Sequence, residues 1–180
     1  MNPARSSHVR GLDEEERAAR ALSMSKIHIF VSFDIDHDEE LYQLLLAQSR
    51  SSSSSFLVLG GSKRPMAQDF SSEGVRRRIR EADQVIVICG EHTKVSKGVK
   101  AELCIAQQEG TPYFLLWGRR EIMCTKPIGA KPAEGMYSWT RQILEEQITL
   151  TSRKIGADAA AAIQRNVTRK GSPNSSRSAS

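Results

Sequence analysis

Four short runs of apolar residues alternate with amphipathic segments along the middle of the chain. The runs are rich in β-branched and aromatic side chains and are bounded by turn-forming residues, a pattern typical of β-strands. They span residues 27–33, 56–59, 84–89 and 112–117. The third run is apolar after its first residue, which predicts a strand that is buried on both faces of a sheet.

The segments between and after these runs repeat apolar residues with the spacing of a helix. They predict helices over residues 38–48, 71–82, 96–109 and 138–148. In the first helix we expect Leu41, Leu44 and Leu45 to face inward. Gly110 follows the third helix and is placed to end it as the C′ residue.

Strands that alternate with helices predict one α/β domain with a doubly wound parallel sheet, covered by helices on both sides. We expect this single domain to span residues 25–150, with strand order 2-1-3-4 and a short fifth strand before Tyr137. Ligands bind such sheets beyond the carboxyl ends of the strands, at the switch point of the strand order. The loops after Phe33, Leu59 and Cys89 are therefore the candidate binding loops.

The two ends of the chain lack a periodic apolar face. Met24 directly precedes the first strand, so we expect residues 1–24 to be a disordered extension or the product of a start codon assigned too far upstream. Residues 151–180 end in GSPNSSRSAS, which has the composition of a disordered segment, and we expect a flexible tail.

The composition indicates where the protein works. The chain has 180 residues, of which 39% are hydrophobic, enough for one core. No apolar run is long enough to cross a membrane, and the first residues do not have the pattern of a signal peptide. The three cysteines have no metal-ligand spacing and fit reduced thiols, so we expect a cytoplasmic protein with no membrane partner.

The net charge of +5 raises the question of nucleic acid binding. Basic residues are scattered apart from a cluster at 76–80, which a solvated helix face explains better than a phosphate-binding patch. Aromatic residues make up 6% of the chain and do not interleave with that cluster, as a stacking surface for bases would require. Nucleic acid is therefore an unfavoured partner.

The loop after the first strand carries three carboxylates, Asp34, Asp36 and Asp38. Three carboxylates suit a metal site or a phospho-receiver, but a receiver also needs an aspartate where Cys89 ends the third strand. An acidic loop also repels the phosphate of a flavin. Capping of the following helix accounts for Asp38. Asp34 lies nearest the strand end, and the pattern favours a binding role and a structural role equally.

The loop after the second strand reads GGSKRP and is neither a Walker A loop nor a dinucleotide fingerprint, so it supports no claim of that kind. Taken alone, it predicts an exposed turn. At the edge of the switch point, its Lys63 and Arg64 would also be placed to contact the phosphates of a dinucleotide.

An apolar stripe on the third predicted helix is interrupted by Glu102. The stripe is formed by Val95, Val99, Leu103 and Ala106. A carboxylate at the buried edge of a helix is costly unless it is paired or functional. The pattern alone favours a glutamate that turns outward to a basic neighbour. Three such neighbours are available: Lys94, Lys97 and Arg119. His92, after the third strand, is a further candidate near the cleft.

Three segments resemble TIR domains, in the same order along the chain. SKGVKAEL, at 96–103, is similar to the SxWCxxEL motif of that family, and FVSFD, at 30–34, looks like its first strand and following loop. Residues 131–140 resemble the bacterial TIR-like family that includes the sensor subunit of the Thoeris anti-phage system. The resemblance covers residues 26–148, with Gly98-Val99 in place of the Trp-Cys pair of the motif.

This resemblance implies a TIR-like fold of the flavodoxin-like kind, in an enzyme that takes NAD as its substrate and needs no cofactor or metal. Glu102 stands at the position of the glutamate that is catalytic in NAD-cleaving members. The nucleotide would be held by six residues: Phe33, Asp34, Lys63, Arg64, His92 and Ser96.

A lone carboxylate suits this reaction. Nicotinamide leaves from NAD without needing a proton, because its ring nitrogen is already cationic in the substrate. One carboxylate can stabilise the oxocarbenium-like state that forms. The expected product is ADP-ribose or a cyclic isomer, an intracellular messenger that acts on a separate effector protein. Activation by self-association or by a phage or host protein is also expected.

Two other functions remain open. A non-catalytic TIR-like module would assemble with itself or a partner through the loop after the second strand. A flavodoxin-like nucleotide-binding protein would instead carry a bound cofactor, visible in its absorbance spectrum.

Overall fold

The computed structural model describes residues 26–63 and 72–152 of the chain. The expectations for the N-terminal extension, for nearly all of the C-terminal tail and for Arg64 therefore lie outside the described residues.

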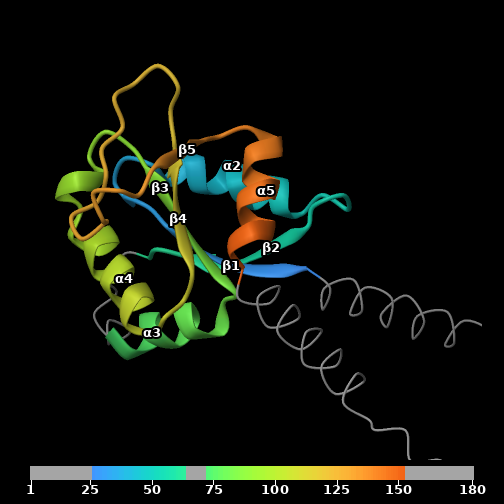
Figure 1. The fold of residues 1–180 in the computed structure, drawn as a ribbon, viewed down its shortest axis with the longest axis horizontal. Helices are drawn as coiled ribbons and strands as arrows, with labels where there is room; N and C mark the ends of the chain where they lie inside the picture. The colour runs from blue at the N-terminus through green and yellow to red at the C-terminus, as the bar shows by residue number, and fades with distance from the viewer. Residues whose placement is uncertain (1–25, 64–71, 153–180) are drawn as a thin grey trace, which may run out of the picture.

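Five parallel strands form one sheet in the order β2-β1-β3-β4-β5 (Figure 1), which confirms the predicted order and the short fifth strand. The strands are β1 (Ile27–Ser32), β2 (Phe56–Gly61), β3 (Gln84–Cys89), β4 (Tyr113–Trp117) and β5 (Met136–Ser138). All six residues of β3 are buried, as its apolar sequence predicts.

Four α-helices cover the sheet, α2 and α5 on one face and α3 and α4 on the other (Figure 1). They are α2 (Glu39–Ser49), α3 (Ser72–Glu81), α4 (Lys97–Gln108) and α5 (Arg141–Thr151), and a 3₁₀ turn, η1 (Thr93–Val95), precedes α4. Helix α5 begins three residues later than predicted because the Thr140 hydroxyl accepts a hydrogen bond from the Ile143 N–H and caps it there. Gly110 has φ +61° and ends α4 as predicted.

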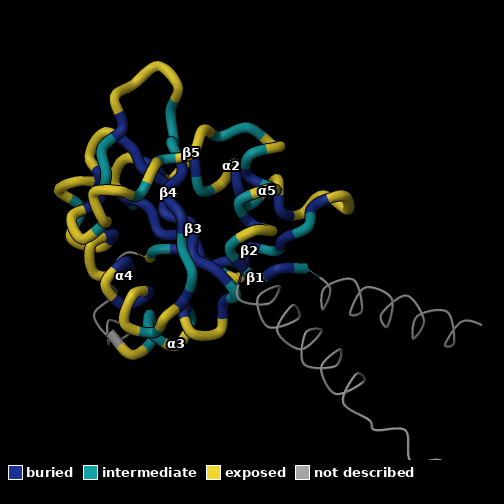
Figure 2. The backbone as a smooth tube through the Cα atoms, viewed as in Figure 1, coloured by how far each residue is buried: buried dark blue, intermediate teal, exposed yellow. Residues whose placement is uncertain are grey.

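Apolar side chains fill both sides of the sheet. The central strands β1 and β3 are buried along nearly their whole length (Figure 2). On the α2 and α5 side the inward row of α2 follows an i, i+4 spacing through Leu41, Leu45 and Ser49. Leu44 is 53% exposed, so its predicted inward position is wrong, because the buried row is only one residue wide. The prediction that Val95 belongs to the apolar stripe of α4 is also wrong: Val95 lies in η1, before the helix begins, and is 73% exposed.

Strand β2 continues beyond its predicted end through two glycines and contains a bulge. Ile29 pairs with Val58 but Phe30 pairs with Gly60, so Leu59 is passed over. A Cβ on Gly61 would lie 2.7 Å from the Tyr42 ring and 3.0 Å from the Phe33 ring, so only glycine fits. This close approach brings the next residues of the chain against the carboxyl end of β1.

None of the helices within residues 26–63 and 72–152 is long and apolar enough to cross a membrane.

Candidate functional site

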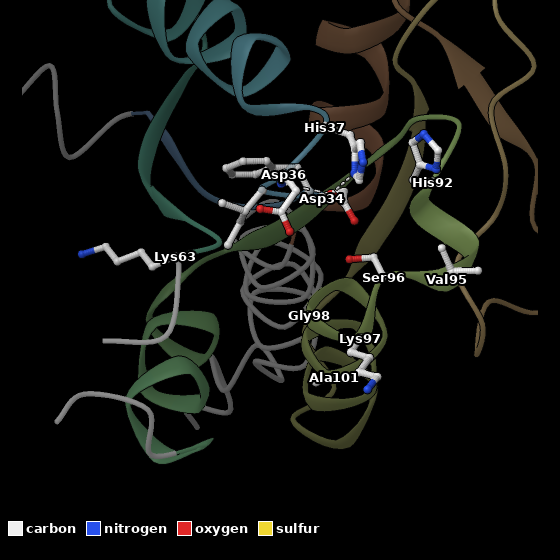
Figure 3. A pocket seen from close by; sticks show the side chains of 12 residues that line it. Asp34, Asp36, His37, Lys63, His92, Val95, Ser96, Lys97, Gly98 and Ala101 are labelled. Carbon is white, nitrogen blue, oxygen red and sulfur yellow. Dashed lines mark hydrogen bonds and ion pairs between the residues drawn. The ribbon is translucent and has the colours of Figure 1, made fainter. Parts of the chain in front are cut away.

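A cavity of about 560 Å³ lies at the carboxyl edge of the sheet, beside the strands β1 and β3 where the strand order switches (Figure 3). It is lined by residues 33–37 after β1, Lys63 after β2, His92 after β3 and the start of α4. The three loops named from the sequence therefore meet around one space. The volume is in the range of small-molecule sites.

Asp34 joins two of these loops. Its Oδ1 lies 2.8 Å from His37 Nδ1 and accepts a hydrogen bond from the Asp36 N–H at 3.1 Å, and Ser96 on the other side of the cavity is also a hydrogen-bond partner (Figure 3). Burial raises the pKa of Asp34, but the hydrogen bonds from His37 and Ser96 outweigh burial and leave that pKa below its usual value. Asp34 is therefore a carboxylate at neutral pH.

His92, proposed from its place after the third strand, lies in the cavity wall beside His37 (Figure 3). The two ring centroids are 4.0 Å apart. The sequence analysis missed His37, although it follows Asp34 by three residues in the same loop. Both histidines are exposed, and together they form one side of the cavity.

The remaining predicted nucleotide contacts differ in their surroundings. Phe33 is buried and stacks on Tyr42 with ring centroids 4.7 Å apart, so most of its ring belongs to the core. Lys63 is exposed at the rim, and its ammonium points away from the other side chains in Figure 3. Ser96 occupies the N-cap position of α4, but its hydroxyl makes no capping bond and is used by Asp34 instead.

Glu102 faces the sheet from the middle of α4 and is only 6% exposed. Its Oε2 accepts hydrogen bonds from the Ser32 hydroxyl at 2.6 Å and the Ser62 hydroxyl at 2.5 Å. The expected outward ion pair with Lys94, Lys97 or Arg119 is therefore wrong. It fails because two serines at the ends of neighbouring strands satisfy the carboxylate inside the fold.

The environment of Glu102 changes its acidity. Burial raises the pKa of Glu102 from 4.5 to about 7, against the opposing effects of the hydrogen bonds from Ser32 and Ser62 and of the charge of Arg78. Acid and carboxylate forms are thus both populated at neutral pH. Perturbed carboxyl groups of this kind cluster at functional sites.

A comparison to known families agrees with this fold. Residues 30–119 match the family described as Thoeris protein ThsB, TIR-like domain. The match spans half of the chain. The chain belongs to the ThsB TIR-like family. It is thus a TIR-like defence protein of the Thoeris type. No curated protein matches it.

In this TIR-like domain the glutamate lies directly behind the cavity wall. Glu102 itself does not line the cavity, but Ala101, the residue before it, does. Phe33 and Lys63, which follow Ser32 and Ser62 in the chain, also line it. Each of the three residues Ser32, Ser62 and Glu102 is therefore the sequence neighbour of a lining residue.

The two residues that depart from the TIR motif occupy different places. Val99 is fully buried and packs in the core between α4 and the sheet. Gly98 lines the cavity, and a Cβ there would have no atom within 4 Å. The departure leaves the core filled and widens the cavity at the start of α4.

Arg78 is a site residue that the sequence analysis missed. It donates to the Gly61 carbonyl at 3.1 Å and lies 5.6 Å from the centre of the Phe30 ring. The interpretation of the 76–80 cluster as a solvated face is therefore wrong for Arg78. The interpretation holds for Arg80, which is exposed, although Arg76 and Arg80 also pair with Glu109.

Asp38 departs from its expected capping role. It stands at the N-cap position of α2 without a side-chain capping bond, and it is almost fully buried. Arg119 Nη2 lies 3.4 Å from its Oδ1, and its Oδ2 has no hydrogen-bond partner in the described structure. Burial raises the pKa of Asp38 in spite of the Arg119 charge. Among the described residues, no three His, Cys, Asp or Glu side chains are grouped to hold a metal ion.

Proposed function

We propose that this TIR-like domain cleaves NAD at the bond between nicotinamide and ribose. The product would be ADP-ribose or a cyclic isomer, released as an intracellular signal in anti-phage defence. The observation that carries the proposal is Glu102: a buried carboxyl with a pKa raised to about 7, one residue behind the wall of a cavity at the switch point. The family match adds support, since the chain is a Thoeris-type protein.

The chemistry requires little more than this group. Breaking the nicotinamide–ribose bond leaves positive charge on the ribose ring and its oxygen, and the departing nicotinamide needs no proton. A carboxylate held in a site of low dielectric stabilises that charge more strongly than it would in water. Water or a second nucleophilic atom of the same nucleotide then completes the reaction, giving the linear or the cyclic product.

The cavity offers complementary groups for the rest of the substrate. Lys63 and Lys97 supply positive charge at its rim for the pyrophosphate. Asp34 is an ionised acceptor for ribose hydroxyls, and the rings of His37 and His92 offer a surface for a base. The substrate is therefore proposed to be a dinucleotide rather than a free base or a sugar phosphate.

The burial of Glu102 also bears on how the proposed activity would be regulated. With 6% of the residue exposed, the carboxyl reaches a substrate only if the wall formed by Phe33, Lys63 and Ala101 shifts. The same feature favours a second candidate function, a non-catalytic interaction module, since the hydroxyls of Ser32 and Ser62 already satisfy the carboxyl. An activating partner or self-association is accordingly part of the proposal.

The test is consumption of NAD by the purified chain, alone and with extract from phage-infected cells, with mass spectrometry of the products. We expect nicotinamide and an ADP-ribose species to appear in equal amounts in the presence of the extract. Extract without the chain is the control. If NAD stays intact under both conditions while the chain restores phage resistance in cells, the interaction module is the correct function.

A further inference from the structure

Two serine hydroxyls meet on one oxygen of Glu102. The donors come from different strands, Ser32 at the end of β1 and Ser62 just after β2, and both donate to Oε2. Glu102 Oε1 accepts no hydrogen bond from residues 26–63 or 72–152. Within these ranges, the carboxyl is thus held at one oxygen only.

The backbone fixes the direction of the Ser62 hydroxyl. Its Oγ accepts a hydrogen bond from the Phe33 N–H at 3.0 Å, so its single proton is directed to Glu102. The Ser62 N–H in turn donates to the Val31 carbonyl at 3.0 Å, which ties the residue to β1. Ser32 is fully buried and has the same acceptor. Both hydroxyl protons are thus directed to the same carboxyl oxygen.

We propose that Ser32 and Ser62 are positioning residues for Glu102: together they hold its Oε2, favour the carboxylate form, and leave Oε1 as the oxygen that meets the substrate. The last part rests on the proposed NAD cleavage, whereas the first two concern Glu102 alone. Neither serine was among the site residues expected from the sequence.

Neutral donors suit this task better than a cation would. A basic residue against Glu102 would neutralise the charge that has to stabilise the ribose cation. Hydroxyl donors favour the ionised carboxyl over the acid and keep its net charge. Among the described residues, Arg78 on α3 is the charged group that acts on Glu102, and its guanidinium binds the Gly61 carbonyl instead of the carboxylate. The two serine hydroxyls are therefore the nearest groups that stabilise the carboxylate form of Glu102.

The test is an NMR titration of the full chain labelled with carboxyl-¹³C glutamate, in which Glu102 is identified by the signal that Glu102→Gln removes. Ser32→Ala and Ser62→Ala should each raise the titration midpoint of Glu102 by about one pH unit, the usual size for a lost bond to a charged acceptor. Ser62→Thr keeps the hydroxyl and should restore the wild-type midpoint.

The matched control is Ser49→Ala. Ser49 is also fully buried, but its hydroxyl donates to the Leu46 carbonyl and touches no carboxylate. It should leave the Glu102 midpoint in place even if it lowers the melting temperature. Unchanged midpoints in both Ser32→Ala and Ser62→Ala would overturn the proposal, as would a shift of equal size in Ser49→Ala.

Enzyme assays separate this proposal from the function on which its last part rests. If NAD is cleaved, the pH at half-maximal kcat should move upward in both alanine variants in parallel with the NMR midpoint, and KM should change little. Shifted midpoints without NAD cleavage by any variant would support the serine roles and reject the proposed reaction. NAD cleavage with a pH profile unchanged by either alanine would support the reaction and reject the serine roles.

Discussion

Two glutamates associated with α4 have opposite surroundings. Glu109, the C-cap residue, is bound by Arg80 and Arg76, and their hydrogen bonds lower its pKa to about 2. Glu102, seven residues earlier, is buried against two neutral hydroxyls, and burial raises its pKa to about 7. Arginines suit a carboxylate that stays charged and structural. Hydroxyls alone leave a carboxylate whose charge is available, which is the more useful state for chemistry.

The largest expected difference between the two is in catalysis. Glu102→Gln should lower kcat for NAD cleavage on the order of a hundredfold or more, since Gln keeps the shape of the side chain but not the charge that stabilises the ribose cation. Glu109→Gln should change kcat less than about threefold, because Glu109 lies outside the cavity and pairs with Arg76 and Arg80 at the surface. Nicotinamide release at saturating NAD is the measurement. Equal effects in the two variants, or full activity in Glu102→Gln, would remove Glu102 from the mechanism.

The pH dependence of stability should distinguish the same two groups. The folded pKa of Glu102 lies above its unfolded value of 4.5, so its contribution is complete below pH 4.5 and is lost as pH rises through about 7. That loss corresponds to about 3 kcal/mol. The folded pKa of Glu109 is depressed to about 2, so its contribution is present above pH 4.5 and is lost as pH falls toward 2.

Urea unfolding at pH 5 and pH 8 measures this difference. Wild type and Glu109→Gln should both lose unfolding free energy between these two values, while Glu102→Gln should lose far less because it cannot ionise. If Glu102→Gln loses as much as wild type, the pKa of Glu102 is not raised and the contrast with Glu109 fails.

A smaller effect is expected from a change in the cavity wall at the start of α4. Gly98→Leu places a side chain into the open space of the cavity and should weaken NAD binding by about tenfold or more, measured by calorimetry. Stability should rise by up to about 1 kcal/mol, because leucine favours a helix more than glycine does. Lys100→Leu, exposed on the same helix and outside the cavity, is the control. Equal NAD affinity in all three proteins would place the nucleotide elsewhere.

The sequence predicts the fold well because the signals are local. Apolar runs and apolar residues at helical spacing indicate which residues are buried. The strand order follows from parallel crossovers that are nearly always right-handed. Leu44 lies beside a buried row of α2 that is one residue wide, and Val95 lies before the first residue of α4. Both features depend on packing rather than on the spacing of apolar residues, so the sequence pattern did not predict them.

The site is less predictable because its contacts are distant in sequence. Glu102 stands out as a carboxylate in an apolar stripe, but its partners lie 70 and 40 residues away, at Ser32 and Ser62. Nothing local separates Ser62 from the other serines of the chain. Arg78 is likewise hidden in a run of arginines, and only the position of Phe30 and Gly61 turns it inward.

The bulge in the outer strand β2 decides which atoms Glu102 meets. Because Leu59 is passed over, continuing the pairing of Val31 with Gly61 by one residue brings Ser62 opposite Ser32. Without the bulge, Leu59 would pair with Phe30, and Gly61 rather than Ser62 would lie opposite Ser32. Regular pairing would thus leave the carboxyl with one hydroxyl fewer, because glycine has no side chain. The irregularity of this edge strand, as much as the identity of any side chain, therefore sets how many hydroxyl donors reach the buried carboxyl.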